Sequence, residues 1–321
     1  MAGPLTGPLG QALAQVTGLA WELRRRAYQR GWAVPERVPA RVVSIGNITV
    51  GGAGKTTLVL HLAASLRAAG ERVAVVTRRY RPGPGGAGDE ELLYRAALGA
   101  EAVYAGDSKR DLARRAAADG AGIVLVDDGF SHWPLERDLD VVLLDRTDPW
   151  GGGALLPAGR LREPLRALQR ASVIVVSRLG ADESPEPWLA EVARRAPAAF
   201  VAAARHRPDG VRTLDGDPLP AGGPARVLTA TGNPEAVAAS AREAGYGPVT
   251  LAAYRDHHWF SLSEAMREHA AAGAGTLLLT AKDAVRWPAG APRERVAVLG
   301  TRWCWVSGGS TVERMVRGED A

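Results

Sequence analysis

The stretch Gly46-Asn47-Ile48-Thr49-Val50-Gly51-Gly52-Ala53-Gly54-Lys55-Thr56-Thr57 decides the fold of this chain. It follows an apolar run, 42–45, that is typical of a buried strand, and it precedes residues 58–66, whose apolar residues have helical spacing. A glycine-rich turn between a strand and a helix surrounds an anion with backbone N–H groups. Lys55 can then reach the β- and γ-phosphates of a nucleoside triphosphate, and the Thr56 hydroxyl can bind Mg²⁺. The stretch therefore predicts a nucleoside-triphosphate site.

The loop departs from the usual phosphate-loop pattern at its beginning. Thr49 stands where the first glycine is expected, and Val50 stands where membrane-partitioning ATPases carry a second lysine. A glycine-rich turn without a nucleotide is the structural alternative, but the order of strand, loop, Gly-Lys-Thr and helix favours a nucleotide site. The residues expected to contact the nucleotide are Thr49, Val50, Gly51, Gly52, Ala53, Gly54, Lys55, Thr56 and Thr57.

Composition narrows the class of protein. The chain has 321 residues, enough for one large or two medium domains, and its 46% hydrophobic content is ordinary for a globular protein. The net charge of +5 would suit nucleic acid, a membrane surface or a phosphorylated substrate. No nucleic-acid-binding signature accompanies this charge, so we expect no nucleic-acid partner. Cys304 is the single cysteine, which excludes an intramolecular disulfide and a cysteine-based zinc site.

The first residues of the chain predict a helix. Leu9, Leu13, Val16 and Leu19 recur at helical spacing, and residues 21–32 then mix aromatic residues with cations. Such a segment fits an amphipathic helix at a membrane interface, and it fits equally a helix packed on the domain with its arginines in water. No stretch approaches the ~20 apolar residues of a membrane-spanning helix, and no signal peptide is expected.

Strand-like and helix-like segments alternate after residue 41. The expected strands are 41–45, 72–77, 102–105, 123–126, 141–144 and 173–177, and most are continuous apolar runs. This pattern predicts an α/β protein with a doubly wound, mainly parallel sheet, whose ligand site lies at the carboxyl ends of the strands. We expect an N-terminal membrane-associating helix (1–40), a phosphate-loop kinase domain (41–204), a linker (205–224) and a smaller C-terminal α/β domain (225–321).

Three acidic residues are candidates for the chemistry. The apolar strand 123–126 ends in Asp127 and Asp128, and a carboxylate at this place in phosphate-loop enzymes holds Mg²⁺. Asp89 opens a helix after the Pro/Gly-rich loop 81–88, so it is either a helix cap or a carboxylate that takes a proton from an acceptor hydroxyl. His132, four residues after Asp128, is either structural or part of the same site.

Three further segments carry polar side chains that local structure does not require. Residues 151–164 form a long irregular segment with two arginines, which is typical of a binding loop. His257 and His258 are adjacent, which favours hydrogen bonding or acid–base chemistry over a shared zinc ion. The pair Lys282-Asp283 does not match the guanine-reading Asn-Lys-x-Asp pattern.

Together these segments resemble the tetraacyldisaccharide 4′-kinase family, the lipid A 4′-kinases, from the N-terminal helix to about Arg286. The segments that carry the resemblance are 46–56, Arg78-Arg79-Tyr80, Gly88-Asp89-Glu90, 127–132, 155–164, Asp256-His257-His258 and Lys282-Asp283-Ala284. The chain departs from the family's usual residues at 77–81, Thr57, Ser131 and 149–153. These departures affect the details of acceptor binding more than the reaction.

The resemblance implies a reaction and a set of roles. The γ-phosphate of ATP would pass to the 4′-hydroxyl of a tetraacyldisaccharide 1-phosphate, giving the 1,4′-bisphosphate of lipid A biosynthesis. The loop through Thr56 would bind ATP and Mg²⁺, and Asp127 and Asp128 match the metal and active-site aspartates. Asp89 resembles the catalytic base, supported by His257. The matching substrate-facing positions are Tyr80, Glu90, His132, Arg162 and Glu163.

The resemblance also implies a peripheral protein on the cytoplasmic face of the inner membrane, with no obligate protein partner. Two alternatives from other classes remain at this point. A membrane-partitioning ATPase that acts as a regulatory switch is disfavoured by Val50 in place of the signature lysine. A GTPase that inserts metals is disfavoured because the chain lacks both Asn-Lys-x-Asp and a Cys/His-rich segment. The sequence leaves open the acyl-chain preference, the oligomeric state and which of Asp127 and Asp128 contacts the metal directly.

Overall fold

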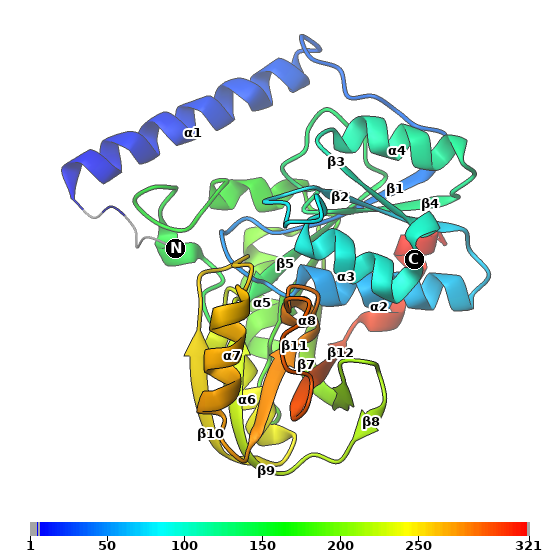
Figure 1. The fold of residues 1–321 in the computed structure, drawn as a ribbon. Coiled ribbons are helices and arrows are strands. Elements are labelled where there is room, and N and C mark those ends of the chain that lie inside the picture. Colours follow the sequence, from blue (N-terminus) through cyan, green and yellow to red (C-terminus); the bar gives the residue numbers. More distant parts are fainter. Residues whose placement is uncertain (1–4, 6, 320–321) are drawn as a thin grey trace. The chain divides into compact units, whose positions relative to one another are not determined.

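The computed structural model describes residue 5 and residues 7–319, and it is an α/β structure built on parallel strands (Figure 1). Its contacts divide the chain into two compact units. The large unit comprises the described residues up to Arg78, Leu98–Arg205 and the residues from Trp303 onward. The small unit comprises Arg79–Ala97 and His206–Arg302.

The large unit is a doubly wound parallel sheet. Its strands are β1 (Arg41–Gly46), β2 (Val73–Arg78), β3 (Val103–Gly106), β4 (Ile123–Asp127), β5 (Leu139–Asp145), β6 (Val173–Ser177) and the first part of β7 (Phe200–Thr213). They lie in the order β7-β6-β5-β1-β4-β2-β3, and every neighbouring pair is parallel. The central strands β4, β5 and β6 are rich in Val, Ile and Leu and are buried, as expected for a parallel sheet that is covered on both faces. The predicted fold class is confirmed.

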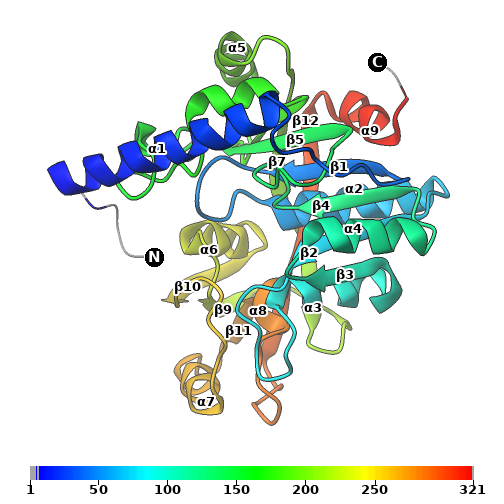
Figure 2. The ribbon, with the colours of Figure 1, turned by 90° about the horizontal axis from the view of Figure 1, so that it is seen from above.

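Helices of the large unit surround this sheet. They are α1 (Pro8–Gln29), α2 (Lys55–Ala68), α4 (Lys109–Ala118), α5 (Glu186–Arg195) and α9 (Gly309–Arg317), with short 3₁₀ helices η1 (Ala100–Ala102), η2 (Gly151–Gly153) and η3 (Leu165–Arg170). Figure 2 shows α4 alongside β3 and β4. α1 is attached through Trp21, which belongs to a buried cluster with Phe130 and Trp133. Among the described residues, no helix is both long and apolar enough to cross a membrane.

The small unit has its own parallel strands. β9 (Gly223–Thr229), β10 (Tyr246–Ala253), β11 (Thr276–Thr280) and the first part of β12 (Val296–Ser307) lie in the order β10-β9-β11-β12. Its helices are α3 (Asp89–Leu98, all but the last residue), α6 (Pro234–Glu243), α7 (Leu262–Ala271) and α8 (Ala281–Ala284). Asn233 and Ser261 cap α6 and α7 with their side chains, as helix-start residues do.

The units do not follow the segments expected from the sequence. The expected linker, 205–224, instead holds the end of β7, the short antiparallel strand β8 (Pro218–Leu219) and the start of β9. Residues 79–97 belong to the small unit although they interrupt the expected kinase domain, and residues from 303 onward belong to the large unit. The reason is that compactness follows contacts between segments far apart in sequence, which local composition does not encode. The first residues of the predicted N-terminal helix, 1–4 and 6, lie outside the described part.

Candidate active site

The predicted phosphate loop joins β1 to α2. Gly51 and Gly54 have φ angles of 115° and 89°, a left-handed region that side-chain-bearing residues rarely adopt, so the glycines at these two positions are required. α2 begins at Lys55, directly after Gly54. Backbone N–H groups at the start of this helix have no helical partner and are free to bind an anion.

Two segments brace the loop from outside. Val50 exchanges hydrogen bonds with Arg160: its N–H donates to the Arg160 carbonyl (2.8 Å) and its carbonyl accepts from Arg160 Nη2 (2.9 Å). At the end of β6, the Ser177 hydroxyl donates to the Ala53 carbonyl (2.9 Å) and Arg178 Nη2 to the Gly52 carbonyl (2.5 Å). The sequence predicted a binding loop around Arg160 but missed Ser177 and Arg178, whose only signal is their place at the carboxyl end of a parallel strand.

A network of charges links the loop to β4. Lys55 Nζ donates to Asn47 Oδ1 (2.9 Å) and lies 3.4 Å from Asp128 Oδ1. Arg162 donates two hydrogen bonds to the Asp128 carboxylate, from Nη1 to Oδ2 (2.8 Å) and from Nη2 to Oδ1 (2.7 Å). Its Nη2 also contacts Asn47 Oδ1. Burial raises the pKa of Asp128, but Lys55 and Arg162 outweigh burial and hold this pKa well below its usual range. Asp128 therefore stays ionised near the phosphate loop.

Asp127 and Asp128 have different partners although they are neighbours. Asp127 is buried at the end of β4, and its Oδ2 lies 3.5 Å from the Thr77 hydroxyl. Asp128 has a φ of 50°, which turns the chain into the left-handed region, and its carbonyl accepts a hydrogen bond from Lys109 Nζ (2.7 Å). Burial lowers the pKa of Lys109. Sequence reasoning missed Lys109; its position as the first residue of α4, after β3, was the available signal.

Two other predicted site residues of the large unit, Glu163 and His132, differ in their surroundings. Glu163 is buried and accepts hydrogen bonds from Trp21 Nε1 (2.7 Å), Ser131 Oγ (2.6 Å) and Arg170 Nη2 (2.8 Å). Its carboxylate thus fixes α1 to the large unit. Burial lowers the pKa of His132 to about 4, and nearby cations add to the effect. His132 is therefore neutral at neutral pH.

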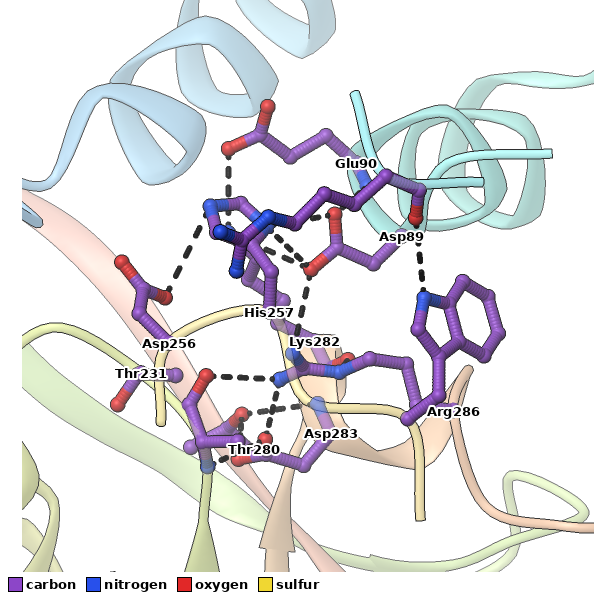
Figure 3. A network of polar contacts seen from close by, with 12 residues as sticks. Asp89, Glu90, Thr231, Asp256, His257, Thr280, Lys282, Asp283 and Arg286 are labelled. Atoms are coloured by element: carbon purple, nitrogen blue, oxygen red, sulfur yellow. Dashed lines mark hydrogen bonds and ion pairs between the residues drawn. The ribbon is translucent and has the colours of Figure 1, made fainter. Parts of the chain in front are cut away.

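The small unit holds the second group of predicted residues, centred on Asp89 at the start of α3 (Figure 3). The Asp89 side chain is buried, and its two oxygens lie 3.0 and 2.9 Å from Nδ1 of His257. Arg286 Nη1 is 3.3 Å and Lys282 Nζ is 3.6 Å from Asp89 Oδ2. Burial raises the pKa of Asp89, but the hydrogen bond from His257 and the charges of Lys282 and Arg286 lower it to about 2.

The remaining predicted residues of this unit surround the pair. Glu90 Oε1 is 3.1 Å from Lys282 Nζ, and the ring of Tyr80 meets the His257 imidazole edge-on with centroids 5.3 Å apart. Asp256 Oδ1 is 3.8 Å from the other imidazole nitrogen, Nε2. The indole of Trp259 donates to the Arg81 carbonyl (3.1 Å) and so ties down the Pro/Gly-rich loop. Tyr80, Glu90, Asp89 and His257 are therefore brought together, and Arg286 joins them unpredicted.

Each unit thus offers a distinct chemistry. The large unit has a glycine-rich anion-binding loop, a lysine and two aspartates at the carboxyl end of β4, which suits a nucleotide with its phosphates. The small unit has a buried carboxylate–imidazole pair, which suits proton transfer from a hydroxyl group.

Comparison with known proteins agrees with this chemistry. The family model for tetraacyldisaccharide-1-P 4′-kinase matches residues 8–314. A tetraacyldisaccharide 4′-kinase of Anaeromyxobacter dehalogenans (strain 2CP-C) is 40% identical over 321 residues, with 87% of this chain and 83% of that protein covered. A tetraacyldisaccharide 4′-kinase of Halorhodospira halophila is 34% identical over 288 residues, with 85% and 82% covered.

A solved structure shares the fold. The crystal structure of LpxK from Aquifex aeolicus in complex with ATP has a TM-score of 0.72 to this chain at 22% identity, and it covers 97% of this chain and 98% of that one. The match of the family model over nearly the whole chain confirms the resemblance inferred from the motifs. The chain belongs to the tetraacyldisaccharide-1-P 4′-kinase family, and it is a kinase.

Proposed function

We propose that this chain transfers the γ-phosphate of ATP to the 4′-hydroxyl of a tetraacyldisaccharide 1-phosphate and releases ADP and the 1,4′-bisphosphate. The observation that carries the proposal is the Asp89–His257 pair, because a buried carboxylate held by an imidazole is what a hydroxyl acceptor needs. A switch ATPase without an acceptor needs no such pair. Membership of the kinase family supports the same reaction over both alternatives.

The phosphate loop would hold the triphosphate. The Val50 N–H already donates to the Arg160 carbonyl, so the backbone N–H groups of residues 51–57 would donate to phosphate oxygens. Lys55 would exchange its contact with Asn47 for the β- and γ-phosphates. Arg162 keeps Asp128 in place beside that lysine, so Asp128 orients the ammonium group. These contacts make the loop rigid before the nucleotide arrives, which favours binding.

Mg²⁺ would accompany the nucleotide. The Thr56 hydroxyl, at the start of α2, and the Asp127 carboxylate, at the end of β4, are oxygen donors of the kind that Mg²⁺ prefers. The described residues contain no cluster of three or more metal-ligating side chains, and Mg²⁺ at nucleotide sites takes most of its ligands from phosphates and water. When bound, the ion would neutralise charge on the phosphates. We assign Thr56 and Asp127 to hold it.

Asp89 would accept the proton of the acceptor hydroxyl. A carboxylate with a pKa of about 2 is a weak base, so it cannot deprotonate a free alcohol in advance. Phosphoryl transfer has a loose transition state in which the hydroxyl loses its proton late, and a weak but well-placed base suffices. His257 Nδ1 donates to both oxygens and so orients the carboxylate. Tyr80 and Glu90 lie beside the pair and would contact the sugar.

We further propose that α1 holds the protein on the cytoplasmic face of the inner membrane. Five apolar side chains of this helix face outward, with exposed fractions from 42% for Leu13 to 70% for Leu9: Leu9, Leu13, Val16, Leu19 and Leu23. Exposed apolar residues along one helix are typical of an interfacial helix, and arginines at 24–26 favour anionic lipid. The acyl chains of the acceptor would lie in the same bilayer.

The direct test is a phosphoryl-transfer assay. The purified chain, γ-labelled ATP, Mg²⁺ and the disaccharide 1-phosphate in mixed micelles should give a labelled bisphosphate. The same mixture with GTP tests the nucleotide, and omission of the lipid tests for idle hydrolysis. Rapid hydrolysis that the lipid does not affect, with no labelled lipid, would contradict the proposal.

A further inference from the structure

Arg286 is a buried cation that has no role in the reaction proposed above. Its side chain has no exposure to solvent, and Figure 3 shows it between Asp89 and Asp283. Nη1 is 3.3 Å from Asp89 Oδ2, while Nε donates to the Lys282 carbonyl (3.1 Å). A buried charge is costly unless it is paired, so this arginine must do something that a smaller apolar residue would not.

The position of the guanidinium is set by Asp283. Arg286 Nη2 donates to Asp283 Oδ1 (2.5 Å), and the same oxygen accepts from the Ala230 N–H (2.9 Å). The second oxygen, Oδ2, accepts from the Thr280 hydroxyl (2.6 Å). Asp283 therefore connects Ala230, which follows β9, with Thr280 at the end of β11. These contacts hold the Asp283 carboxylate rigidly in position to bind Arg286.

The Ala230 carbonyl links Arg286 to the backbone of His257. It accepts from Arg286 Nη2 (3.1 Å) and from the backbone N–H of His257 (3.2 Å). His257 has a φ of 63°, a left-handed conformation that costs free energy in a residue with a side chain and persists only where its surroundings enforce it. One guanidinium thus contacts the Asp89 carboxylate and the carbonyl that holds the His257 backbone.

On the basis of these contacts, and resting on the proposed role of Asp89, we propose that Arg286 is a positioning residue that fixes Asp89 and His257 in the geometry for proton transfer. The Arg286 side chain cannot touch the acceptor, because it has no exposed surface. Lys282 differs: its side chain is 17% exposed and it pairs with Glu90 (3.1 Å) as well as with Asp89. Arg286 therefore acts only through its neighbours.

The arrangement also has an electrostatic consequence. The cationic or titratable groups that face Asp89 are His257, Lys282 and Arg286, and the acidic neighbours are Glu90 on its own helix and Asp256 beside His257. A guanidinium remains charged at every pH at which proteins fold. It therefore keeps Asp89 ionised as the pH falls, and its loss should let Asp89 take up a proton at higher pH.

Two double variants, each of which replaces both members of a guanidinium–carboxylate pair of the small unit by uncharged residues, test this role of Arg286. The double variant Arg286→Met/Asp283→Asn removes both buried charges while the amide oxygen can still accept from Ala230. Arg226 and Glu268 form another guanidinium–carboxylate pair of the small unit (2.6 Å), without contact to Asp89, and Arg226→Met/Glu268→Gln is the matched control. Folding is checked at each pH by near-UV circular dichroism, and kcat and kcat/KM for the lipid acceptor are measured from about pH 3 to 9, so that the acidic limb lies within the range.

We expect kcat of the Arg286→Met/Asp283→Asn variant to fall at least about tenfold. The acidic limb of its pH–rate profile should move up by about one pH unit or more, because Asp89 then takes up a proton at higher pH. The control pair should change neither. Arg286→Lys retains the charge without the planar fork, so its acidic limb should stay in place while kcat falls severalfold. If Arg286 only stabilised the fold, the acidic limb of the pH–rate profile would not move in either variant.

The results separate this inference from the proposed function. Asp89→Asn is measured in the same series: if it turns over like the wild type, the base assignment fails. If Asp89→Asn is impaired but the Arg286→Met/Asp283→Asn variant keeps the wild-type rate and limb, the role of Arg286 alone is overturned. Should that variant not fold, Arg286→Lys decides, because an unchanged kcat in it contradicts positioning by the fork.

Discussion

Nδ1 of His257 lies 3.0 Å from Oδ1 and 2.9 Å from Oδ2 of Asp89, so a single imidazole nitrogen contacts both oxygens of a buried carboxylate. The two residues are 168 positions apart in the chain. This contact leaves His257 Nε2 as the second polar atom of the ring, with Asp256 at 3.8 Å. The pair can therefore hold one proton between defined atoms.

Asp89→Asn should abolish most of the activity and leave the fold intact. Asparagine caps a helix nearly as well as aspartate but cannot accept the hydroxyl proton, so kcat should fall by about 10²–10⁴. His257→Ala should also lose activity, and the double variant should lose less than the product of the two effects because the pair acts as a unit. Steady-state kinetics with the lipid acceptor measure all three.

The neighbouring histidine is the matched control for that series. His258 bonds Glu264 (3.0 Å) instead of Asp89, and its replacement by alanine should leave kcat within a fewfold of wild type. Near-normal turnover by Asp89→Asn would make Asp89 a structural residue, and Asp128 would become the next candidate base.

Lys55→Ala and Asp127→Ala should each nearly abolish phosphoryl transfer. Lys55 opens α2 at the phosphate loop, and Asp127 ends β4 beside it. Loss of the lysine removes the cation from the phosphates, and loss of the aspartate removes a metal ligand. Saturating ATP should not rescue either variant, whereas Arg67→Ala, in the last turn of α2, should remain active. A Lys55 variant with normal turnover at saturating ATP would refute the nucleotide assignment.

Three substitutions on the exposed face of α1 should release the protein from membranes. The change Leu9→Gln/Val16→Gln/Leu19→Gln removes three exposed apolar side chains without touching the buried Trp21. Flotation with vesicles of phosphatidylethanolamine and phosphatidylglycerol should show loss of binding, because interfacial affinity scales with the apolar area buried in lipid. The exchange of the exposed polar residues Gln11 and Gln15 for serine is the control. Equal flotation of both variants and the wild type would show that α1 does not bind the bilayer.

Trp21→Phe should destabilise the protein by about 1.5–3 kcal/mol, the range for a hydrogen bond to a charged group. The indole Nε1 donates to Glu163 Oε2 at 2.7 Å, and both side chains are buried. Urea unfolding followed by circular dichroism measures the change. Trp32→Phe, at a position with 73% exposure, should change the free energy of unfolding by much less. If both variants lose the same amount, the Trp21–Glu163 contact does not fix α1.

Asp89 should make stability depend on pH in acid. Its pKa is lowered from 3.8 to about 2 in the folded protein, so the folded carboxylate is favoured whenever the pH lies above the unfolded value. That stabilisation, about 2 kcal/mol, is fully present above about pH 4–5 and is lost as the pH falls through about 2. Urea unfolding of wild type and Asp89→Asn at a series of pH values should show a gap that closes toward low pH. A gap that does not change with pH would contradict the shift.

The sequence by itself determined the features that depend on neighbouring residues. The loop 46–57 needs glycines at fixed spacing between a strand and a helix. Several of the six predicted strands are continuous apolar runs, because a parallel sheet is covered on both faces. Asn233 and Ser261 start helices through their own side chains. The family could be inferred from the sequence because each motif that carries the resemblance is a short run of neighbouring residues.

Only the tertiary structure decided which distant segments share a unit. Residues 79–97 join 206–302, and β7 runs through the expected linker, because strand pairing and side-chain contacts at long range override the polar, Pro- and Gly-rich composition there. Three contacts arise in the same way: those of Glu163 with its partners, the hydrogen bond of Lys109 to the Asp128 carbonyl, and the ion pair of Arg286 with Asp89. A buried charge is stable only beside groups that the fold brings to it, and residue spacing in the chain carries no record of them.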